Sequence, residues 1–361
     1  MVKRIGVLTG GGDCPGLNAV LRAVVKTAIG RYGLEVIGFR DGYRGLVVND
    51  YLKLKRSNVS GILVRGGTIL GSSNRDNPFN FKIEADGKVE YTDMSDQVVK
   101  NIEELGIDCM VIIGGDGTMA SARDFAHKGL KVIGVPKTID NDLSATDTTF
   151  GFMTAVNTAT DALDKLHTTA ESHHRIMILE VMGRYAGWIA LESGIAGGAD
   201  VILIPEIPYD IKKVAQKIND RKSRGKSFSI IVVAEGAKPL GGEMVVGKMV
   251  KDSPDPVRLG GIGNFVAQQL ESLTCLETRV TVLGHVQRGG SPTTYDRILS
   301  TRYGVAAVEL AQAERFGMMV SLQGDTITAV PIDDAVGKLK TVPPEGELVR
   351  VGKSIGVEFG D

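Results

Sequence analysis

The stretch that decides the fold runs from Cys109 to Thr118, with the sequence Cys-Met-Val-Ile-Ile-Gly-Gly-Asp-Gly-Thr. Its apolar first half is typical of a buried strand, and its second half is a glycine-rich loop carrying a carboxylate and a hydroxyl. A second apolar run, Val132–Val135, leads into Pro136–Asp142, with the sequence Pro-Lys-Thr-Ile-Asp-Asn-Asp. Ligands of open α/β sheets bind outside the carboxyl ends of the strands. The two loops therefore predict one site for a phosphate, its metal and a base.

A third loop of the same kind lies near the start of the chain. Lys3–Thr9 leads into Gly10–Gly16, and a helical pattern follows from about Asn18. Glycines at such a turn let backbone N–H groups approach a polyphosphate at a helix N-terminus. The spacing matches neither the P-loop nor the dinucleotide fingerprint. Taken singly, a glycine turn more often just closes a connection, so the combination of loops carries the prediction.

Composition and charge are those of a soluble two-domain enzyme. The chain has 361 residues, 43% of them apolar, and its 42 Lys and Arg nearly balance 43 Asp and Glu. We therefore expect two domains and no partnership with nucleic acid or an anionic membrane. The three cysteines, Cys14, Cys109 and Cys275, have no paired spacing, which predicts a reducing cytoplasm. No signal peptide or membrane span is expected.

Strands are expected to alternate with helices along the chain, which predicts parallel sheets covered on both faces. Helical patterns cover Met94–Leu105 and Thr149–Ser172. Lys238–Gly263 is interpreted as an insertion or long surface loop, whose final Gly-Gly-Ile-Gly opens a helix. The remaining expected elements are strands, at Lys3–Thr9, Glu35–Phe39, Cys109–Ile113, Lys131–Val135, Arg175–Val181, Asp200–Ile204, Phe228–Ala234 and Thr278–Leu283.

Five motifs occur in order along the chain and can be compared with known families. They are Gly11–Asp13, Gly114–Thr118, Pro136–Asp142, Met182–Arg184 and Gly284–Gly290. Together they resemble the 6-phosphofructokinases, specifically the mixed-substrate group III clade of the phosphofructokinase A family, over essentially the whole chain. The resemblance implies an α/β fold with two Rossmann-like three-layer domains, mainly parallel sheets and a site in the cleft between them.

The resemblance also implies how the chain is divided and what it does. Residues 1–151 plus 287–337 would bind the nucleotide, and residues 152–286 plus 338–361 would bind the sugar phosphate. The expected reaction is phosphorylation of fructose 6-phosphate at its 1-hydroxyl by MgATP. Alternatives are a pyrophosphate-dependent phosphofructokinase, a lipid or NAD kinase, which would lack the His285–Arg288 phosphate site, and a sugar-phosphate sensor without turnover.

The acidic residues of the loops have two interpretations each. Asp116 suits Mg²⁺ held partly through water, or alternatively caps the helix that follows. Asp140 and Asp142 would point the same way in an extended segment and could form a base with a raised pKa, or alternatively belong to an Asx turn. The family match makes Asp140 the base, makes Asp142 its support, and puts Thr138 in contact with the transferring group.

Further roles come from the resemblance alone. Arg75 would bridge the donor and acceptor phosphates, and Arg184 would stabilise the transition state. Arg175 and Arg279 would reach the sugar phosphate of a neighbouring subunit, which implies a homodimer or homotetramer. The implied nucleotide contacts are Gly12, Arg75, Asp76, Gly115, Asp116, Gly117 and Thr118. The implied sugar-phosphate contacts are Thr138, Ile139, Asp140, Arg175, Met182, Gly183, Arg184, Glu235, Arg279, His285, Val286, Gln287 and Arg288.

Two positions bear on the phosphoryl donor, and others bear on regulation. Pyrophosphate enzymes of the family usually have aspartate where this chain has Gly117 and lysine where it has Lys137. An aspartate would crowd and repel the α-phosphate of ATP, so Gly117 favours ATP, whereas Lys137 helps pyrophosphate without excluding ATP. Basic residues of a possible effector pocket are Arg22, Lys26, Arg224 and Lys226, but His167 replaces a family arginine there, so effector control is not inherited.

Overall fold

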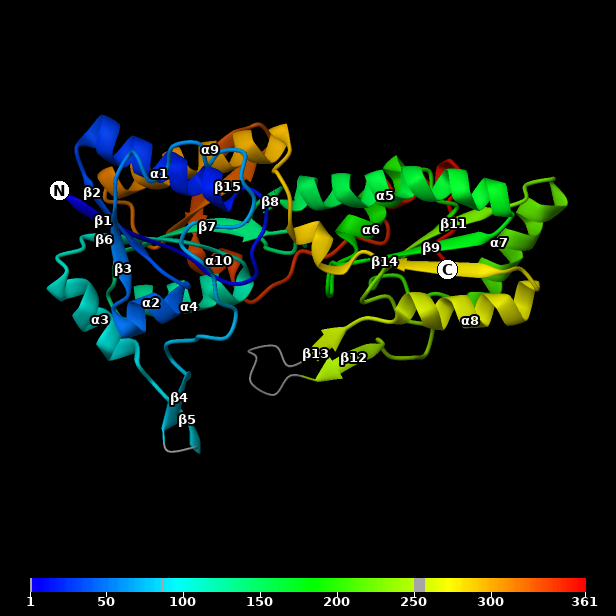
Figure 1. The fold of residues 1–361 in the computed structure, drawn as a ribbon, viewed down its shortest axis with the longest axis horizontal. Coiled ribbons are helices and arrows are strands. Elements are labelled where there is room, and N and C mark those ends of the chain that lie inside the picture. The colour runs from blue at the N-terminus through cyan, green and yellow to red at the C-terminus, as the bar shows by residue number, and fades with distance from the viewer. Residues whose placement is uncertain (1, 86–87, 250–256) are drawn as a thin grey trace.

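The computed structural model describes residues 2–85, 88–249 and 257–361. The described residues form an eight-stranded sheet, a four-stranded sheet and two separate two-stranded hairpins. Figure 1 shows the two large sheets in opposite halves of an elongated molecule, with helices above and below each. The predicted α/β fold with mainly parallel sheets is confirmed.

The larger sheet has the strand order β16-β15-β7-β6-β1-β2-β3, with β8 beside β7. Its central pairs are parallel, and only the outer strands β3 and β16 pair antiparallel. Its strands are β1 (Arg4–Thr9), β2 (Glu35–Phe39), β3 (Tyr51–Leu54), β6 (Cys109–Gly114), β7 (Val132–Thr138), β8 (Phe150–Gly151), β15 (Met318–Gln323) and β16 (Thr326–Pro331).

Helices cover both faces of this sheet because the side chains of its buried strands alternate between two apolar cores. Val7 and Val111 join the core beneath α1 (Leu17–Tyr32) and α9 (Thr294–Gln312). Their neighbours Leu8 and Ile112 join the core on the opposite face. That face is covered by α2 (Tyr43–Val48), α3 (Ser95–Glu104), α4 (Asp116–His127) and α10 (Ile332–Ala335).

The smaller sheet is entirely parallel, in the order β10-β11-β9-β14. Its strands are β9 (Ile176–Val181), β10 (Val201–Leu203), β11 (Ser229–Ala234) and β14 (Thr278–Val282). The helices α5 (Phe152–His173) and α6 (Trp188–Ala196) pack on one face, and α6 also contacts α11 (Glu347–Ser354). On the other face lie α7 (Ile211–Ser223) and α8 (Ile262–Thr274).

The chain passes between the two halves more than once. After β14 and the 3₁₀ helix η1 (Gly284–Arg288), α9 returns the chain to the larger sheet, where β15 and β16 complete one edge. A later crossing brings α11 back to the smaller half. The two hairpins, β4 (Phe81–Ala85) with β5 (Lys88–Thr92) and β12 (Val246–Met249) with β13 (Val257–Leu259), both project from the lower side in Figure 1.

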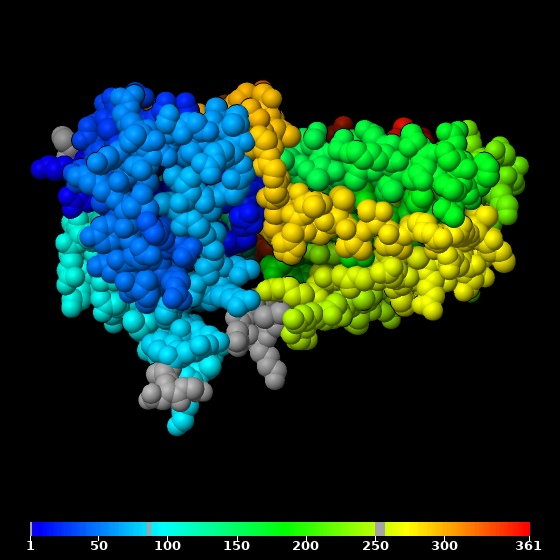
Figure 2. All heavy atoms as spheres, viewed as in Figure 1, coloured from blue at the N-terminus to red at the C-terminus, as the bar shows by residue number. Residues whose placement is uncertain are grey.

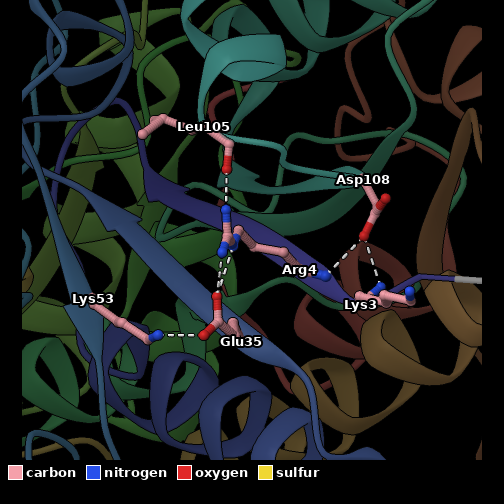
Figure 3. Close-up of polar contacts among 6 residues, drawn as sticks. All are labelled: Lys3, Arg4, Glu35, Lys53, Leu105 and Asp108. Atoms are coloured by element: carbon pink, nitrogen blue, oxygen red, sulfur yellow. Dashed lines mark hydrogen bonds and ion pairs between the residues drawn. The ribbon is translucent and has the colours of Figure 1, made fainter.

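A charged network ties together the amino ends of the larger sheet (Figure 3). The Nε of Arg4 donates to Glu35 Oε2 at 2.8 Å, which joins β1 to β2, and Lys53 of β3 bonds the other oxygen of Glu35. The backbone N–H of Arg4 donates to Asp108 at 2.8 Å, just before β6. Lys53 and Arg4 lower the pKa of Glu35 by bonding its ionised form. These contacts fix one end of the sheet, and the motif loops lie at the other.

Several boundaries differ from the sequence expectation. β7 runs through Pro136–Thr138, which were expected in the loop, because Lys137 and Thr138 pair with β8. The same pairing delays α5, which begins at Phe152 and not Thr149. The insertion at Lys238–Gly263 contains the β12–β13 hairpin, and its residues 250–256 lie outside the described part. The strands β3, β15 and β16 of the larger sheet were not anticipated, and β3, with four residues, is too short to show a periodicity.

Candidate active site

The carboxyl ends of the two sheets face each other. In the larger sheet β7, β6 and β1 are neighbours, so the loops after Thr138, Gly114 and Thr9 emerge side by side. In the smaller sheet β11, β9 and β14 are neighbours and end near Glu235, Met182–Arg184 and η1. Figure 1 shows β14 pointing toward the larger half, and Figure 2 shows the surface indented where blue atoms meet yellow and orange ones.

The loop after β1 joins the loop of residues 71–76. The backbone N–H of Gly11 donates to the carbonyl of Ser73 at 2.9 Å, and Ser73 in turn bonds Asp76 through its hydroxyl. Arg75 is exposed at the rim. A pocket of about 390 Å³ opens here, lined by Gly11, Gly12, Asp13, Thr68, Gly71, Ser72 and Asn74. It is polar and glycine-rich, as a site for phosphate requires.

The loop after β6 is packed against the loop after β1 through Thr118. A Cβ at Gly10 would lie 2.7 Å from Thr118 Cγ2, and one at Gly114 would lie 2.3 Å from Thr118 Cβ, so both positions need glycine. Gly117 differs, because a Cβ there would meet nothing within 4 Å. Asp116 is the first residue of α4 and Gly115 occupies the cap position without a side-chain bond. The carboxylate of Asp116 is therefore not a helix cap.

Asp140, Asn141 and Asp142 are buried but do not form an extended segment. Asn141 has a φ of 52°, so the expectation that an extended backbone aligns the two carboxylates is wrong. The backbone N–H of Asp140 instead donates to Thr138 Oγ1 at 3.0 Å. Burial first, and then the charge of Asp140, raise the pKa of Asp142 to about 7, and Arg184 opposes the shift. Asp140 Oδ1 is buried and has no hydrogen-bond partner among the described residues.

Glu235 and Arg184 approach this pair from the smaller half. The backbone N–H of Arg184 donates to Glu235 Oε1 at 3.1 Å. Burial and then the charge of Asp140 raise the pKa of Glu235 to about 7. Arg184 has a φ of 51° and follows Gly183, which has a φ of 145°. The loop after β11 packs closely on this turn, since a Cβ on Gly236 would lie 2.0 Å from the Arg184 carbonyl oxygen. Met182, at the start of this turn, is half-buried.

Lys137 and Arg288 both meet the loop after β1. The Lys137 side chain is 3% exposed and its amine donates to the Gly12 carbonyl. Burial lowers the pKa of Lys137, and Arg288 adds to the shift. A Cβ at Gly12 would lie 2.7 Å from Arg288 Nη1, which donates to the Asp13 carbonyl at 3.2 Å. A lysine from β7 and an arginine from η1 thus converge at one glycine turn.

The remaining candidates from the smaller half vary in exposure. His285 and Val286 are exposed, whereas Gln287 is buried and its Nε2 donates to the Gly284 carbonyl at 3.1 Å. The 3₁₀ conformation of η1 puts His285 and Arg288, three residues apart, on the same side. From the larger half, Ile139 is fully buried, so only its backbone is available to a ligand.

Arg175 and Arg279 do not join the site of their own chain. They flank the amino ends of β9 and β14, and the Nε of Arg175 donates to Glu277 Oε2 at 2.5 Å. Arg279 binds the other carboxylate oxygen of Glu277. β9 has six residues, so Arg175 lies about 20 Å along the strand from the turn that carries Arg184.

The donor set fits Mg²⁺ better than a metal with an all-protein cage. Mg²⁺ usually takes one or two carboxylates and completes its shell with water and substrate phosphates. Asp116, Asp140 and Asp142 are close enough for their charges to interact. Among residues 2–85, 88–249 and 257–361, no three His, Cys, Asp or Glu side chains form a ligand cluster. A bound phosphate would therefore have to complete the coordination.

Two features singled out in the sequence, and the single tryptophan of the chain, have structural partners. The glycine turn before α8 is occupied by the buried carboxylate of Glu180, which accepts the N–H groups of Gly261 and Gly263 at 3.0 and 2.8 Å. It is a loop-to-helix turn, as expected from the sequence. His167 Nε2 lies 2.7 Å from the Gly197 carbonyl oxygen. Trp188 Nε1 donates to the Lys340 carbonyl at 2.9 Å.

Sequence reasoning missed two contributors to this region. Thr68 lines the pocket, and Lys340 bonds Asn141 across 199 positions of sequence. Neither residue lies in a motif, and no local signal would have identified them.

Known proteins resemble this chain over its whole length. The sequence profile described as Phosphofructokinase matches residues 4–311. The chain belongs to the phosphofructokinase family. It is 63% identical over 362 residues to ATP-dependent 6-phosphofructokinase 2 of Clostridium perfringens, covering 100% of this chain and 99% of that one. It is 55% identical to the ATP-dependent 6-phosphofructokinase of Chloroflexus aurantiacus, covering 99% and 98%.

Solved structures of phosphofructokinases have the same fold. The chain matches the Saccharomyces cerevisiae phosphofructokinase with a TM-score of 0.77 and 32% identity, covering 98% of this chain but only 46% of the yeast one. A pyrophosphate-dependent phosphofructokinase from Nitrosospira multiformis matches with a TM-score of 0.82, covering 99% and 93%, but its identity of 21% supports the fold alone. No helix in the described part of the chain is long and apolar enough to cross a membrane.

The raised pKa of Glu235 predicts a pH-dependent stability. Because the folded pKa of about 7 exceeds the ordinary glutamate pKa of 4.5, the folded protein binds more protons between these values. The free energy of unfolding should therefore fall as pH rises through this window. Glu235→Gln should flatten that slope and stabilise the protein at pH 8 by on the order of 1 kcal/mol. Urea titrations of the ligand-free protein at pH 5 to 8 measure the slope.

Glu103→Gln provides the control, because Glu103 is exposed on α3. It should leave the slope unchanged. Equal slopes for wild type and Glu235→Gln would contradict the assigned pKa.

Proposed function

We propose that this phosphofructokinase transfers the γ-phosphoryl group of MgATP to the 1-hydroxyl of fructose 6-phosphate, giving fructose 1,6-bisphosphate and ADP. The observation that carries the proposal is the unpartnered Oδ1 of Asp140, buried between phosphate-type loops on one side and Arg184 with Glu235 on the other. The full-length relatives named ATP-dependent 6-phosphofructokinases support it.

The half containing the larger sheet, residues 1–151 plus 287–337, is the proposed nucleotide domain. The polar pocket beside Gly12 would receive the triphosphate, with backbone N–H groups as donors. Arg75 at the pocket rim would neutralise charge on the transferring group. The other proposed contacts are Asp76, Gly115, Asp116, Gly117 and Thr118.

Asp116 is the proposed protein ligand of Mg²⁺. Its position in the first turn of α4, not used for capping, leaves the carboxylate available. Bound there with ATP, Mg²⁺ would neutralise charge on the β- and γ-phosphates. Thr138, at the end of β7, would contact the transferring group from the protein side.

Asp140 is the proposed general base. Burial first, and then the charge of Asp140, raise the pKa of its neighbour Asp142 to about 7. The buried Oδ1 of Asp140, which has no hydrogen-bond partner among the described residues, is available to accept the proton of the sugar 1-hydroxyl. Arg184 would stabilise the negative charge that develops on the phosphoryl oxygens.

Residues 152–286 plus 338–361 are the proposed sugar-phosphate domain. Glu235 would hydrogen-bond sugar hydroxyls, and His285 with Arg288 would bind the 6-phosphate. Met182, Gly183, Val286, Gln287 and the backbone of Ile139 would complete the contacts. Arg175 and Arg279 lie too far along the sheet to serve this site, which supports their contribution to a neighbour's site. We therefore propose a homodimer or homotetramer, acting in the cytoplasm.

Pyrophosphate is the rival donor, and Lys137 is the observation that favours it. A buried cation beside Gly12 would attract the compact charge of pyrophosphate. Gly117 leaves open space where a larger donor would extend, which supports ATP. Attraction by Lys137 acts on either donor, whereas an obstruction at residue 117 would act on ATP alone, so the open space decides for ATP.

Asp140→Ser should lower kcat at least ~10²-fold while fructose 6-phosphate binding stays near normal, because proton transfer is lost and the phosphate contacts remain. A coupled assay measures kcat, and calorimetry measures sugar-phosphate binding. Asp325→Ser, at an exposed position, is the matched control. A kcat within a few-fold of wild type would remove Asp140 from this role.

Mixing inactive Arg279→Ala with inactive Asp140→Ser protein should restore activity once subunits exchange. A hybrid site would take Asp140 from one chain and Arg279 from the other, so a dimer should regain about one quarter of full activity. The coupled assay follows recovery with time. No recovery despite exchange, or a fully active monomer in sedimentation, would contradict the shared site.

Gly117→Asp should lower kcat/KM for ATP far more than for pyrophosphate, because its carboxylate would crowd and repel the α-phosphate. Gly117→Ala adds a Cβ without charge in open space and separates fold damage from repulsion. Coupled assays with each donor measure the effect. The donor assignment is wrong if the unmodified enzyme prefers pyrophosphate tenfold or more, about 1.4 kcal/mol.

A further inference from the structure

The segment from Leu339 to Val342 connects the two halves of the molecule directly behind the Asp140–Asp142 loop. Leu339 forms a backbone bridge with Leu143, and the N–H of Lys340 donates to the Asp142 carbonyl at 2.8 Å. On the other side, the N–H of Val342 donates to Glu206 Oε1 at 2.8 Å. Within three residues, Lys340 to Val342, the segment is therefore hydrogen-bonded both to the loop after β7 and to the smaller half.

The side chain of Lys340 is committed to the same loop. Its Nζ donates to Asn141 Oδ1 at 3.0 Å, to the Thr146 carbonyl at 3.0 Å and to the Asp147 carbonyl at 2.7 Å. An ammonium group has three N–H donors, so these contacts use its full capacity. Lys340 Nζ also lies 5.6 Å from the centroid of the Trp188 ring, which comes from the smaller half.

Asn141 is the residue through which these contacts affect Asp140. Its left-handed backbone, with a φ of 52°, separates the two buried carboxylates. Its Oδ1 also accepts the N–H of Thr149 at 3.1 Å. Lys340 and Thr149 therefore hold one amide oxygen from two directions, and this fixes the turn on either side of which Asp140 and Asp142 lie.

We propose that Lys340 is a positioning residue, which sets the orientation of the Asp140 carboxylate by holding the Asn141 turn against the Trp188 side of the cleft. The inference rests on the proposed role of Asp140. Among the described residues, the ammonium group of Lys340 donates hydrogen bonds to Asn141, Thr146 and Asp147, none of which is a proposed substrate contact. Its effect on turnover therefore passes through the loop.

The charges around Lys340 provide an independent readout. Three carboxylates face it, Asp147 and Asp142 from the loop and Glu192 from α6. Burial lowers the pKa of Lys340 to about 8, and these carboxylates oppose the shift. Removal of the cation should therefore raise the pKa of Asp142.

Amide hydrogen exchange in the ligand-free enzyme tests the loop itself. Lys340→Met keeps the length of the side chain and removes its three donors, so peptides covering residues 141–149 should exchange faster than in wild type. Lys338→Met is the matched control, since Lys338 is exposed two residues away. Unchanged exchange in Lys340→Met would overturn the proposal. This measurement needs no turnover, so it stays decisive even if fructose 6-phosphate and ATP prove not to be the substrates.

Kinetics then test whether the loop contact acts on Asp140. Lys340→Met should lower kcat about tenfold or more with the KM for fructose 6-phosphate nearly unchanged, because only the orientation of the base is altered. Asn141→Gly keeps the left-handed backbone accessible and removes the shared amide. If both act through one contact, the double variant should be no worse than the poorer single one. Additive losses in the double variant would overturn the proposal.

Discussion

Three carboxylates, the buried Asp140 and Asp142 and the half-buried Glu235, lie close together between the carboxyl ends of two mainly parallel sheets. Burial disfavours the ionised forms of Asp142 and Glu235, and repulsion by the charge of Asp140 adds to this, so both pKa values rise to about 7. That repulsion is an unfavourable feature of the empty protein. It is tolerated because the sheets and their cores are stable enough to hold the loops in place.

The same constraint explains the cations around the cleft. Lys137, Arg184 and Arg288 each approach a motif loop, and Lys340 supports the carboxylate loop from behind. With the chain's formal net charge of −1, no global field attracts an anionic substrate, so cations placed locally have to do so. The proposed phosphoryl transfer requires this combination of a base and nearby cations, because the cations attract the reacting phosphates and neutralise their charge.

Family membership and site geometry are independent observations that agree with each other. The match along residues 4–311 reflects the order of the motifs in the chain. The structure adds that the motifs meet, because β7-β6-β1 and β11-β9-β14 are neighbouring strands whose carboxyl ends face one another. Fold likeness alone does not select the donor, since pyrophosphate-dependent enzymes also have this fold. The proposed determinants of that choice are Gly117 and Lys137.

The sequence by itself determined the buried parallel strands and the loops after them, because continuous apolar runs and glycine-rich turns are local signals. It also indicated Asp116, Asp140 and Arg184 through their motifs, and Glu235 through the family resemblance. The tertiary structure alone decided that Asn141 adopts a left-handed conformation and that Lys340 reaches it. It also put Arg175 at the end of β9 away from the cleft. These features depend on strand order and on chain crossings, which bring distant residues together without leaving any periodic pattern in the sequence.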